Sequence, residues 1–283
     1  MSIASPFVVG TTPRRNFMAP PTRDPKMNRA KCFILATLLA AGMAGQAHAA
    51  LVAEYNFNEG SGTTTAPTVG SVDGTLTGGA TFVSNGIQGG AVDLTGGLVN
   101  FGNNMVPTGP FSVQIWVETS TGGMPASYQT GGDVGGFIVA IGNIGDGCGT
   151  PPGSAEFYVA YPCSGNSAAL VNNGQWHQLV GVFNGSTSSI YVDGALQSTS
   201  SGGNQIDAEP ATTDFLLGGI VEGTTPTNEY QGLVSDLQLY NNALSADDVR
   251  ALYDSGIAPI PEPVSLGLFG MGLCALRLVR RRV

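Results

Sequence analysis

The chain has 283 residues and a formal net charge of −9, but the charge is unevenly distributed. Residues 1–49 hold six Lys or Arg against one acid, and residues 261–283 hold four Arg against one Glu. The stretch between them, 50–260, has Arg250 as its one base against 18 acids, a net charge of −17. Binding to nucleic-acid phosphates or to anionic membrane surfaces needs clustered cations, so this composition excludes both for the central stretch.

Residues 1–49 are predicted to be an N-terminal extension followed by a secretory signal peptide. The charged stretch Lys26–Lys31 precedes the apolar run Cys32–Ala44, and Gln46–Ala49 follows with the A-x-A pattern of a cleavage site. The 13 residues of the run are too few to span a membrane as a helix. We therefore expect export, with signal peptidase cleaving after Ala49.

The segment ahead of the signal peptide, residues 1–26, has two interpretations. The stretch Arg14–Met18 weakly resembles a twin-arginine export motif, although the apolar run does not follow it closely. The interpretation we favour is that the true start is Met27, which would leave the preceding residues outside the native protein.

Residues 50–256 have the texture of an all-β domain, with short apolar stretches separated by Gly, Asn, Ser and Thr. Phe111–Val117 alternates between apolar and polar residues, which predicts a strand with one buried face. Leu179–Phe183 is apolar throughout, as expected for a strand covered on both faces. Further strands are predicted over Leu51–Phe57, Phe215–Gly218 and Leu233–Tyr240.

A hairpin and one short helix complete the predicted domain. Asp193 and Gly194 separate two short strand patterns, and Asp-Gly favours the type I′ turn of tight hairpins. Ser245 is predicted to cap a helix whose apolar residues lie at helical spacing, and Gly256 is predicted to end it.

Residues 257–263 are predicted to be a linker containing the tripeptide Pro261-Glu262-Pro263, and residues 264–283 a transmembrane helix with an Arg-rich end. The apolar part has 16 residues, or about 24 Å as a helix, a little less than a hydrocarbon core. These features together resemble the PEP-CTERM sorting signal of Gram-negative bacteria that make exopolysaccharide. The resemblance implies cleavage near the tripeptide by an exosortase, a membrane-embedded cysteine protease. The alternative is an ordinary C-terminal anchor.

The β domain carries a series of short motifs in a fixed order. They are Tyr55–Gly60, Gly74–Leu76, Gly89–Val92, Phe111–Trp116, Gly174–Phe183, Ile190–Gly194 and Gly232–Ser245. Together they resemble the LamG-like jelly-roll domains of the concanavalin A-like lectin/glucanase superfamily. The resemblance implies an all-β jelly-roll sandwich of two antiparallel sheets, with one short C-terminal helix.

The resemblance also suggests calcium as a cofactor. Related domains often hold a structural calcium with an Asp at the position of Ser235 and another Asp at the Pro67–Val72 turn. Asp73 and Asp236 are the neighbouring substitutes here and are the candidate ligands. A shift of one residue along a strand reverses the face of a side chain, so this prediction depends on where Asp236 points.

The sequence shows no recognisable catalytic apparatus, and we predict that the chain is not an enzyme. His177 lies within a strand motif and is predicted to be structural, whereas hydrolysis by an activated Ser or Cys needs a His base. Glycoside hydrolysis needs two carboxylates. The closest pair, Glu54 and Glu59, is five residues apart and falls on opposite faces of a strand.

Two irregular stretches, 119–136 and 142–165, are predicted to carry a disulfide and a binding site. Cys148 and Cys163 are expected to pair, because an exported chain meets an oxidising compartment. Sugar rings stack on aromatic faces, and sugar hydroxyls donate to carboxylates. The tyrosines of these stretches are expected to be exposed, and the candidate ligand-binding residues are therefore Tyr128, Asp133, Asp146, Tyr158 and Tyr161.

We expect an exported, exosortase-sorted, lectin-like binding module that binds polysaccharide or a cell-surface protein. Its expected location is an inner-membrane intermediate, and then the cell surface or the exopolysaccharide matrix. One alternative is a structural or adhesive matrix protein without a defined ligand. The other alternative is a glycan hydrolase of the same fold.

Overall fold

The structure is a computed structural model. It describes residues 50–103, 105–128, 136–142, 149–160, 165–201, 213–222, 225–227 and 229–257.

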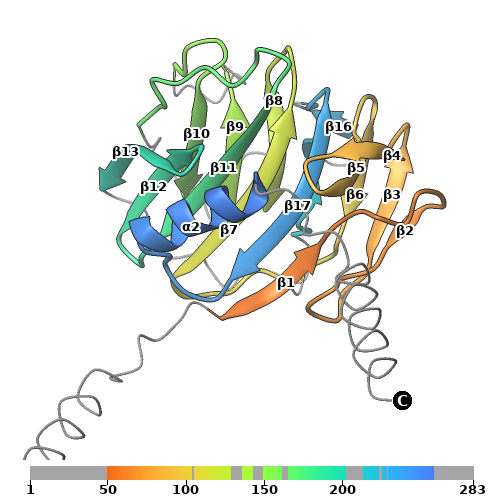
Figure 1. The fold of residues 1–283 in the computed structure, drawn as a ribbon, viewed down its shortest axis with the longest axis horizontal. Coiled ribbons are helices and arrows are strands. Elements are labelled where there is room, and N and C mark those ends of the chain that lie inside the picture. The colour runs from red at the N-terminus through yellow and green to blue at the C-terminus, as the bar shows by residue number, and fades with distance from the viewer. Residues whose placement is uncertain are drawn as a thin grey trace, which may run out of the picture. The chain divides into compact units, whose positions relative to one another are not determined.

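The described residues form two main antiparallel sheets. Sheet A runs in the order β13-β12-β11-β7-β17-β5-β4, and β1 also pairs with β17. In Figure 1 the strands of sheet A lie in front of β8, β9 and β10, which belong to the second sheet. The strands of sheet A are β1 (Leu51–Tyr55), β4 (Thr81–Gly86), β5 (Gly89–Asp93), β7 (Phe111–Glu118), β11 (Trp176–Phe183), β12 (Thr187–Val192), β13 (Ala195–Ser201) and β17 (Leu233–Tyr240).

Sheet B runs in the order β10-β9-β8-β14-β6-β3-β2, and β15 and β16 form a separate short hairpin. The predicted sandwich of two antiparallel sheets is therefore confirmed. The strands of sheet B and the hairpin are β2 (Thr64–Thr65), β3 (Gly74–Gly78), β6 (Gly97–Asn100), β8 (Gly123–Tyr128), β9 (Phe137–Ile141), β10 (Ala155–Val159), β14 (Leu216–Leu217), β15 (Ile220–Glu222) and β16 (Thr225–Thr227).

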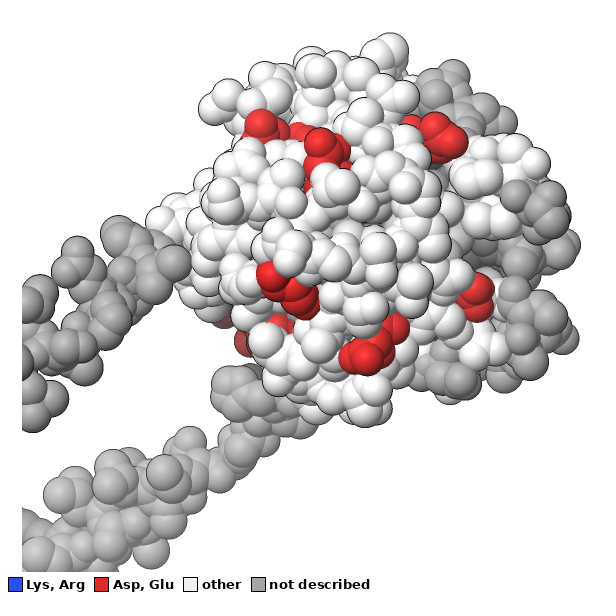
Figure 2. Space-filling model, turned by 90° about the vertical axis from the view of Figure 1, so that its right-hand side faces the viewer, with Lys and Arg blue, Asp and Glu red and all other residues white. Residues whose placement is uncertain are grey.

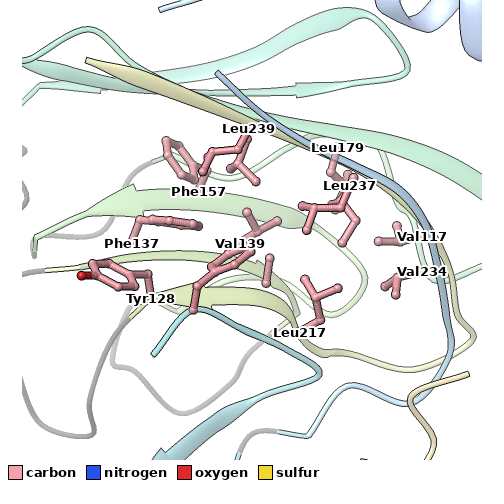
Figure 3. Packing of buried hydrophobic residues seen from close by; sticks show 14 of the residues in the cluster. Val117, Tyr128, Phe137, Val139, Phe157, Leu179, Leu217, Val234, Leu237 and Leu239 are labelled. Atoms are coloured by element: carbon pink, nitrogen blue, oxygen red, sulfur yellow. The ribbon is translucent and has the colours of Figure 1, made fainter. Parts of the chain in front are cut away.

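The main core lies between the sheets and is built by the alternation predicted for β7. Phe111 and Ile115 point into the same buried cluster, together with side chains from sheet B. The ring of Phe111 lies 5.1 Å from that of Phe137 on β9. Figure 3 shows Phe137 and Phe157 of sheet B in this core, with Leu239 of sheet A beside Phe157.

A second apolar cluster lies on the other face of sheet A, under the helix α2 (Ala246–Gly256). Val180 and Val182 of β11 face Val249 of the helix, while Leu179 faces the main core. Figure 1 shows α2 crossing this face of the sheet. β11 is thus covered on both faces, which explains its continuous apolar sequence.

The helix begins as predicted but ends differently. The Ser245 hydroxyl accepts from the backbone N–H of Asp248, and the Asp248 carboxylate accepts from the N–H of Ser245, a capping box. Gly256 belongs to the last turn and does not adopt the left-handed conformation of a helix stop. Instead it lies against Trp116, where an added Cβ would be 2.5 Å from Cζ2 of the indole.

The tight hairpin between β12 and β13 is confirmed. Asp193 and Gly194 have φ angles of +51° and +75°, as a type I′ turn requires at both central positions. Within the ranges described above, no helix is both long and apolar enough to cross a membrane.

Candidate functional site

An open groove of about 660 Å³ lies where the chain leaves β1 and passes the β4–β5 hairpin. Its walls come from the segment after β1, from β4 and from the start of β5. The lining residues are Phe57, Asn58, Gly60, Phe82, Val83, Ser84, Asn85, Gly89 and Gly90.

The groove depends on a close approach between the backbone after β1 and the backbone at the start of β5. Phe57 has a φ of +52°, a left-handed conformation that ends β1 before the predicted strand end, while its side chain stays in the core. The N–H of Gly90 donates to Oδ1 of Asn58 at 2.6 Å. A Cβ on Gly90 would lie 1.9 Å from the carbonyl oxygen of Phe57, so only glycine fits here.

The lining combines polar groups with an apolar surface. Asn58, Ser84 and Asn85 are exposed, and their amides and hydroxyl can both donate and accept hydrogen bonds. Phe82 is half-buried; it packs against the main core and also lines the groove. A ligand with many hydroxyl groups and an apolar face matches this combination.

A bulge in β17 places two polar side chains behind the groove. Ser235 pairs with Trp116 and Gln238 with Gln114, so two residues of β17 lie opposite one residue of β7. Asp236 lies in the bulge and has a φ of +47°. Because of the bulge, the Asp236 carboxylate lies on the same face of sheet A as the Ser235 hydroxyl. Asp236 therefore does not point into the core, although it is one residue beyond Ser235 in the strand.

Hydrogen bonds connect this bulge to the groove. The Ser235 hydroxyl oxygen lies 2.9 Å from the carbonyl oxygen of Gly90 and 3.0 Å from Oδ2 of Asp236. Nε2 of Gln114 donates to the carbonyl oxygen of Asp236 at 2.8 Å. The backbone of Gly90 therefore lines the groove on one side and contacts Ser235 on the other.

Glu54 on β1 lies close enough to Asp236 to act on its protonation. Its Oε1 accepts from Nε2 of Gln238 at 2.8 Å, and its Oε2 accepts from the Thr68 hydroxyl at 2.6 Å. Burial raises the pKa of Asp236 from 3.8 to about 6, and the negative charge of Glu54 adds to this rise. The contact with Ser235 acts in the opposite direction.

Sequence reasoning missed this pair of carboxylates. Acids alternating along one strand would be visible in the sequence, whereas Glu54 and Asp236 come from β1 and β17, which are far apart in the sequence. Antiparallel pairing brings them together, since Glu54 faces Gln238, two residues beyond Asp236. No local pattern in the sequence marks such a pairing.

His177 occupies the structural position predicted for it. Its Nδ1 lies 2.8 Å from Oδ2 of Asp193, in the β12–β13 turn, and its Nε2 lies 3.1 Å from Oδ1 of Asn173. The other oxygen of Asp193 accepts from the N–H of Gln178. Through its two ring nitrogens, His177 thus links the loop before β11 to the β12–β13 hairpin.

Two of the predicted ligand-binding tyrosines are buried, which corrects the expectation that they are exposed. Tyr128 is 7% exposed and packs against Phe137 in the main core (Figure 3), and Tyr158 is 3% exposed. Both lie on regular strands, β8 and β10, that we had assigned to irregular stretches. The other three candidates, Asp133, Asp146 and Tyr161, lie outside the described residues.

The predicted calcium ligands lie on different sheets. Asp73 is exposed, directly before β3 of sheet B, and its charge together with burial raises the pKa of Tyr55 to about 12. Asp236 lies on β17 of sheet A. In the part of the chain that the structure describes, no three His, Cys, Asp or Glu side chains are placed to hold a metal ion together. Calcium binding stays a prediction.

The remaining predicted sites lie outside the described residues. They are the cysteines Cys148 and Cys163, the tripeptide Pro261-Glu262-Pro263 and the two terminal segments, 1–49 and 264–283.

A two-sheet antiparallel sandwich with a groove at the end of one sheet defines a lectin-like jelly-roll domain. Residues 93–250, more than half of the chain, match the sequence family Laminin_G_3, described as the concanavalin A-like lectin/glucanases superfamily. The chain belongs to this superfamily. No curated protein matches it by sequence.

Solved structures share the fold at low sequence identity. Domain 4 of AbnA, a GH43 extracellular arabinanase from Geobacillus stearothermophilus solved in complex with arabinotriose, is 18% identical with a TM-score of 0.57, covering 72% of this chain and 98% of that domain. The binding domain of Paraclostridial Mosquitocidal Protein 1 is 12% identical with a TM-score of 0.54, covering 72% and 52%. A mutant of Trypanosoma rangeli sialidase displaying trans-sialidase activity is 16% identical with a TM-score of 0.52, covering 74% and 34%. The match thus spans about half of the second structure and a third of the third.

These neighbours contradict the prediction that the chain is not an enzyme. Two of them come from glycoside hydrolases, an arabinanase and a sialidase, that contain this fold. The prediction depended on the absence of paired acids along one strand. Glu54 and Asp236 lie near each other on two different strands, so that absence no longer supports it.

Proposed function

We propose that the chain binds carbohydrate and that the groove beside the β4–β5 hairpin holds the sugar. The observation that carries this proposal is the lining, which places the polar side chains of Asn58, Ser84 and Asn85 beside the half-buried ring of Phe82. Amides and a hydroxyl suit sugar hydroxyls, and an aromatic ring suits the apolar face of a sugar. The arabinanase domain of the same fold, described in complex with arabinotriose, supports the proposal.

Titration calorimetry of the purified full-length chain against a panel of oligosaccharides tests this function. Asn85→Ala should weaken binding about tenfold, as expected when a buried hydrogen bond to a ligand is lost. Asn241→Ala is the matched control, because Asn241 is an exposed Asn in the turn after β17, at the far end of that strand from Ser235. Equal affinities for the two variants would place the sugar elsewhere.

Glycoside hydrolysis is the second candidate function. The pair Glu54 and Asp236 favours it, because one carboxylate with a pKa raised to about 6 beside another is the pattern of a general acid with its partner. Release of reducing ends from a polysaccharide panel would reveal the activity. Glu54→Gln and Asp236→Asn should each abolish it without loss of the fold, and activity that survives both substitutions would rule out this pair.

We further propose that the chain is exported and then processed by an exosortase, to reach the cell surface or the exopolysaccharide matrix. The signal-peptide pattern before Ala49 and the tail beginning at Pro261-Glu262-Pro263 support this proposal. The test compares an internally tagged chain in hosts with and without the exosortase. A mature protein that retains residues 264–283 in both hosts would indicate an ordinary anchor instead.

The partner is proposed to be a polysaccharide, with a cell-surface protein as the alternative. A structural or adhesive matrix role without a ligand is the further alternative. The calorimetric panel separates the polysaccharide from both alternatives, because neither a protein-binding module nor a matrix protein without a ligand would bind the sugars.

A further inference from the structure

We infer that the groove selects uncharged sugars and rejects anionic ones, an inference that rests on the proposed function. None of the nine lining residues carries a charge. A carboxylate or sulfate on a sugar needs a guanidinium or an ammonium group to replace its hydration. The groove offers only amides, a hydroxyl, backbone groups and apolar surface.

An acidic residue interrupts the lining segment that follows β1. Glu59 lies between two lining residues, Asn58 and Gly60, and its carboxylate accepts from the Thr65 hydroxyl and the N–H of Ala66. No cation is bonded to it in these contacts.

A second carboxylate lies behind the groove. Asp236 contacts Ser235, which in turn contacts the carbonyl oxygen of Gly90 in the lining. An anionic sugar in the groove would therefore meet no cation in the lining and would have acidic residues behind it and next to it in the chain.

The one base of the central stretch does not compensate for these acids. Arg250 lies on α2, where its guanidinium pairs with Asp254 at 3.0 Å and contacts the ring of Tyr253. Figure 2 faces the side on which β4 lies in Figure 1, and its described surface shows Asp and Glu but no Lys or Arg. With a net charge of −17 on residues 50–260, the long-range field adds to the local repulsion.

The first test compares hexasaccharides that differ only at C6. The pairs are β-1,4-linked glucose and glucuronic acid, β-1,4-linked mannose and mannuronic acid, and α-1,4-linked galactose and galacturonic acid. The full-length chain should bind the neutral member of a pair at least tenfold more tightly at low salt. The ratio should shrink as salt is raised, because screening weakens repulsion between exposed charges.

The outcomes of this comparison are distinct. A uronic acid that binds as tightly as its neutral counterpart, or more tightly, overturns the inference while leaving the proposed function in place. Binding of neither member of any pair contradicts the proposed function itself, and the inference falls with it.

A pair of lysine variants locates the selectivity. Asn85→Lys puts a cation into the groove wall, and Asn241→Lys adds the same charge in the turn after β17. The first variant should raise the ratio of uronic-acid affinity to neutral-sugar affinity at least fivefold more than the second, because loss of the Asn85 amide weakens both sugars alike. Equal gains would assign the effect to the overall charge of the domain and would overturn selection by the groove.

Discussion

The hydroxyl oxygen of Ser235 lies 3.0 Å from Oδ2 of Asp236. The same oxygen lies 2.9 Å from the carbonyl oxygen of Gly90, which can only accept a hydrogen bond. A serine hydroxyl has one proton, so both contacts are hydrogen bonds at once only when Asp236 is protonated and donates to Ser235. The pKa of Asp236 is raised to about 6 by burial, against the effect of the Ser235 contact on the ionised carboxylate, which lowers it.

Asp236→Asn is expected to stabilise the fold at neutral pH and to have no such effect at pH 4. Because the pKa of Asp236 in the folded chain is raised above its ordinary value of 3.8, folding favours the protonated form, and this contribution is lost as the pH rises through about 6. Asn mimics the protonated carboxyl at every pH. Urea unfolding from pH 4 to pH 8 should show the variant gaining about 1–2 kcal/mol over the wild type, mainly between pH 4 and pH 7. A difference independent of pH would indicate an effect on packing instead.

The fold was predictable because its signals are local. The alternation of Phe111–Val117 requires no knowledge of partner strands, and the Asp193-Gly194 turn forms its hairpin from two residues. The error at Gly256 has the opposite cause. Its need for glycine comes from Trp116, 140 positions earlier in the chain, which no helix-stop rule takes into account.

The candidate site was not predictable, because, like the need for glycine at position 256, it depends on residues far apart in the sequence. Phe57 and Asp236 both adopt left-handed conformations although neither is glycine, and these two backbone irregularities shape the groove and the bulge behind it. Tyr128 was assigned to an irregular stretch, because Pro125 and the neighbouring glycines are unusual in a strand, but it lies on the regular strand β8. Its ring is held inside the core by strands that lie elsewhere in the sequence.

Calcium is expected to raise the melting temperature if Asp73 and Asp236 contribute to a binding site. A cation that binds only the folded chain stabilises it by about 2.7 kcal/mol at a hundredfold excess over Kd, which corresponds to roughly 5–10 °C for a domain of this size. Melts with calcium and with chelator measure the shift. Asp73→Asn and Asp236→Asn should each reduce it, and an equal shift from magnesium or sodium chloride would indicate screening of the net negative charge.

Cys148 and Cys163 are expected to be bonded in the exported protein. Mass spectrometry of a non-reduced digest would detect the linked peptides. Cys163→Ser should then lower the free energy of unfolding by about 3 kcal/mol, the loop-closure value for a cross-link of this span, and leave the sandwich folded. Two free thiols in protein recovered from the periplasm would contradict the pairing.

Gly256→Ala is expected to destabilise the domain, although alanine is the better helix former. Helix propensity alone would favour alanine by about 1 kcal/mol. The added Cβ would lie 2.5 Å from Cζ2 and 3.0 Å from Cε2 of Trp116, whose ring stacks on Tyr253 at 5.7 Å and is 3% exposed. Neither the indole nor the helix can withdraw without opening this contact, so we expect a net loss of about 1–3 kcal/mol in urea unfolding.

The matched control for Gly256→Ala is Ser255→Ala, at an exposed position of the same helical turn, which should change stability by less than about 0.5 kcal/mol. Trp116→Leu distinguishes the clash from a general intolerance of Gly256. Because leucine withdraws the ring from Gly256, Gly256→Ala should become neutral or stabilising in that background, even though Trp116→Leu is itself destabilising. A loss of the same size in both backgrounds would show that the indole is not the reason for glycine at this position.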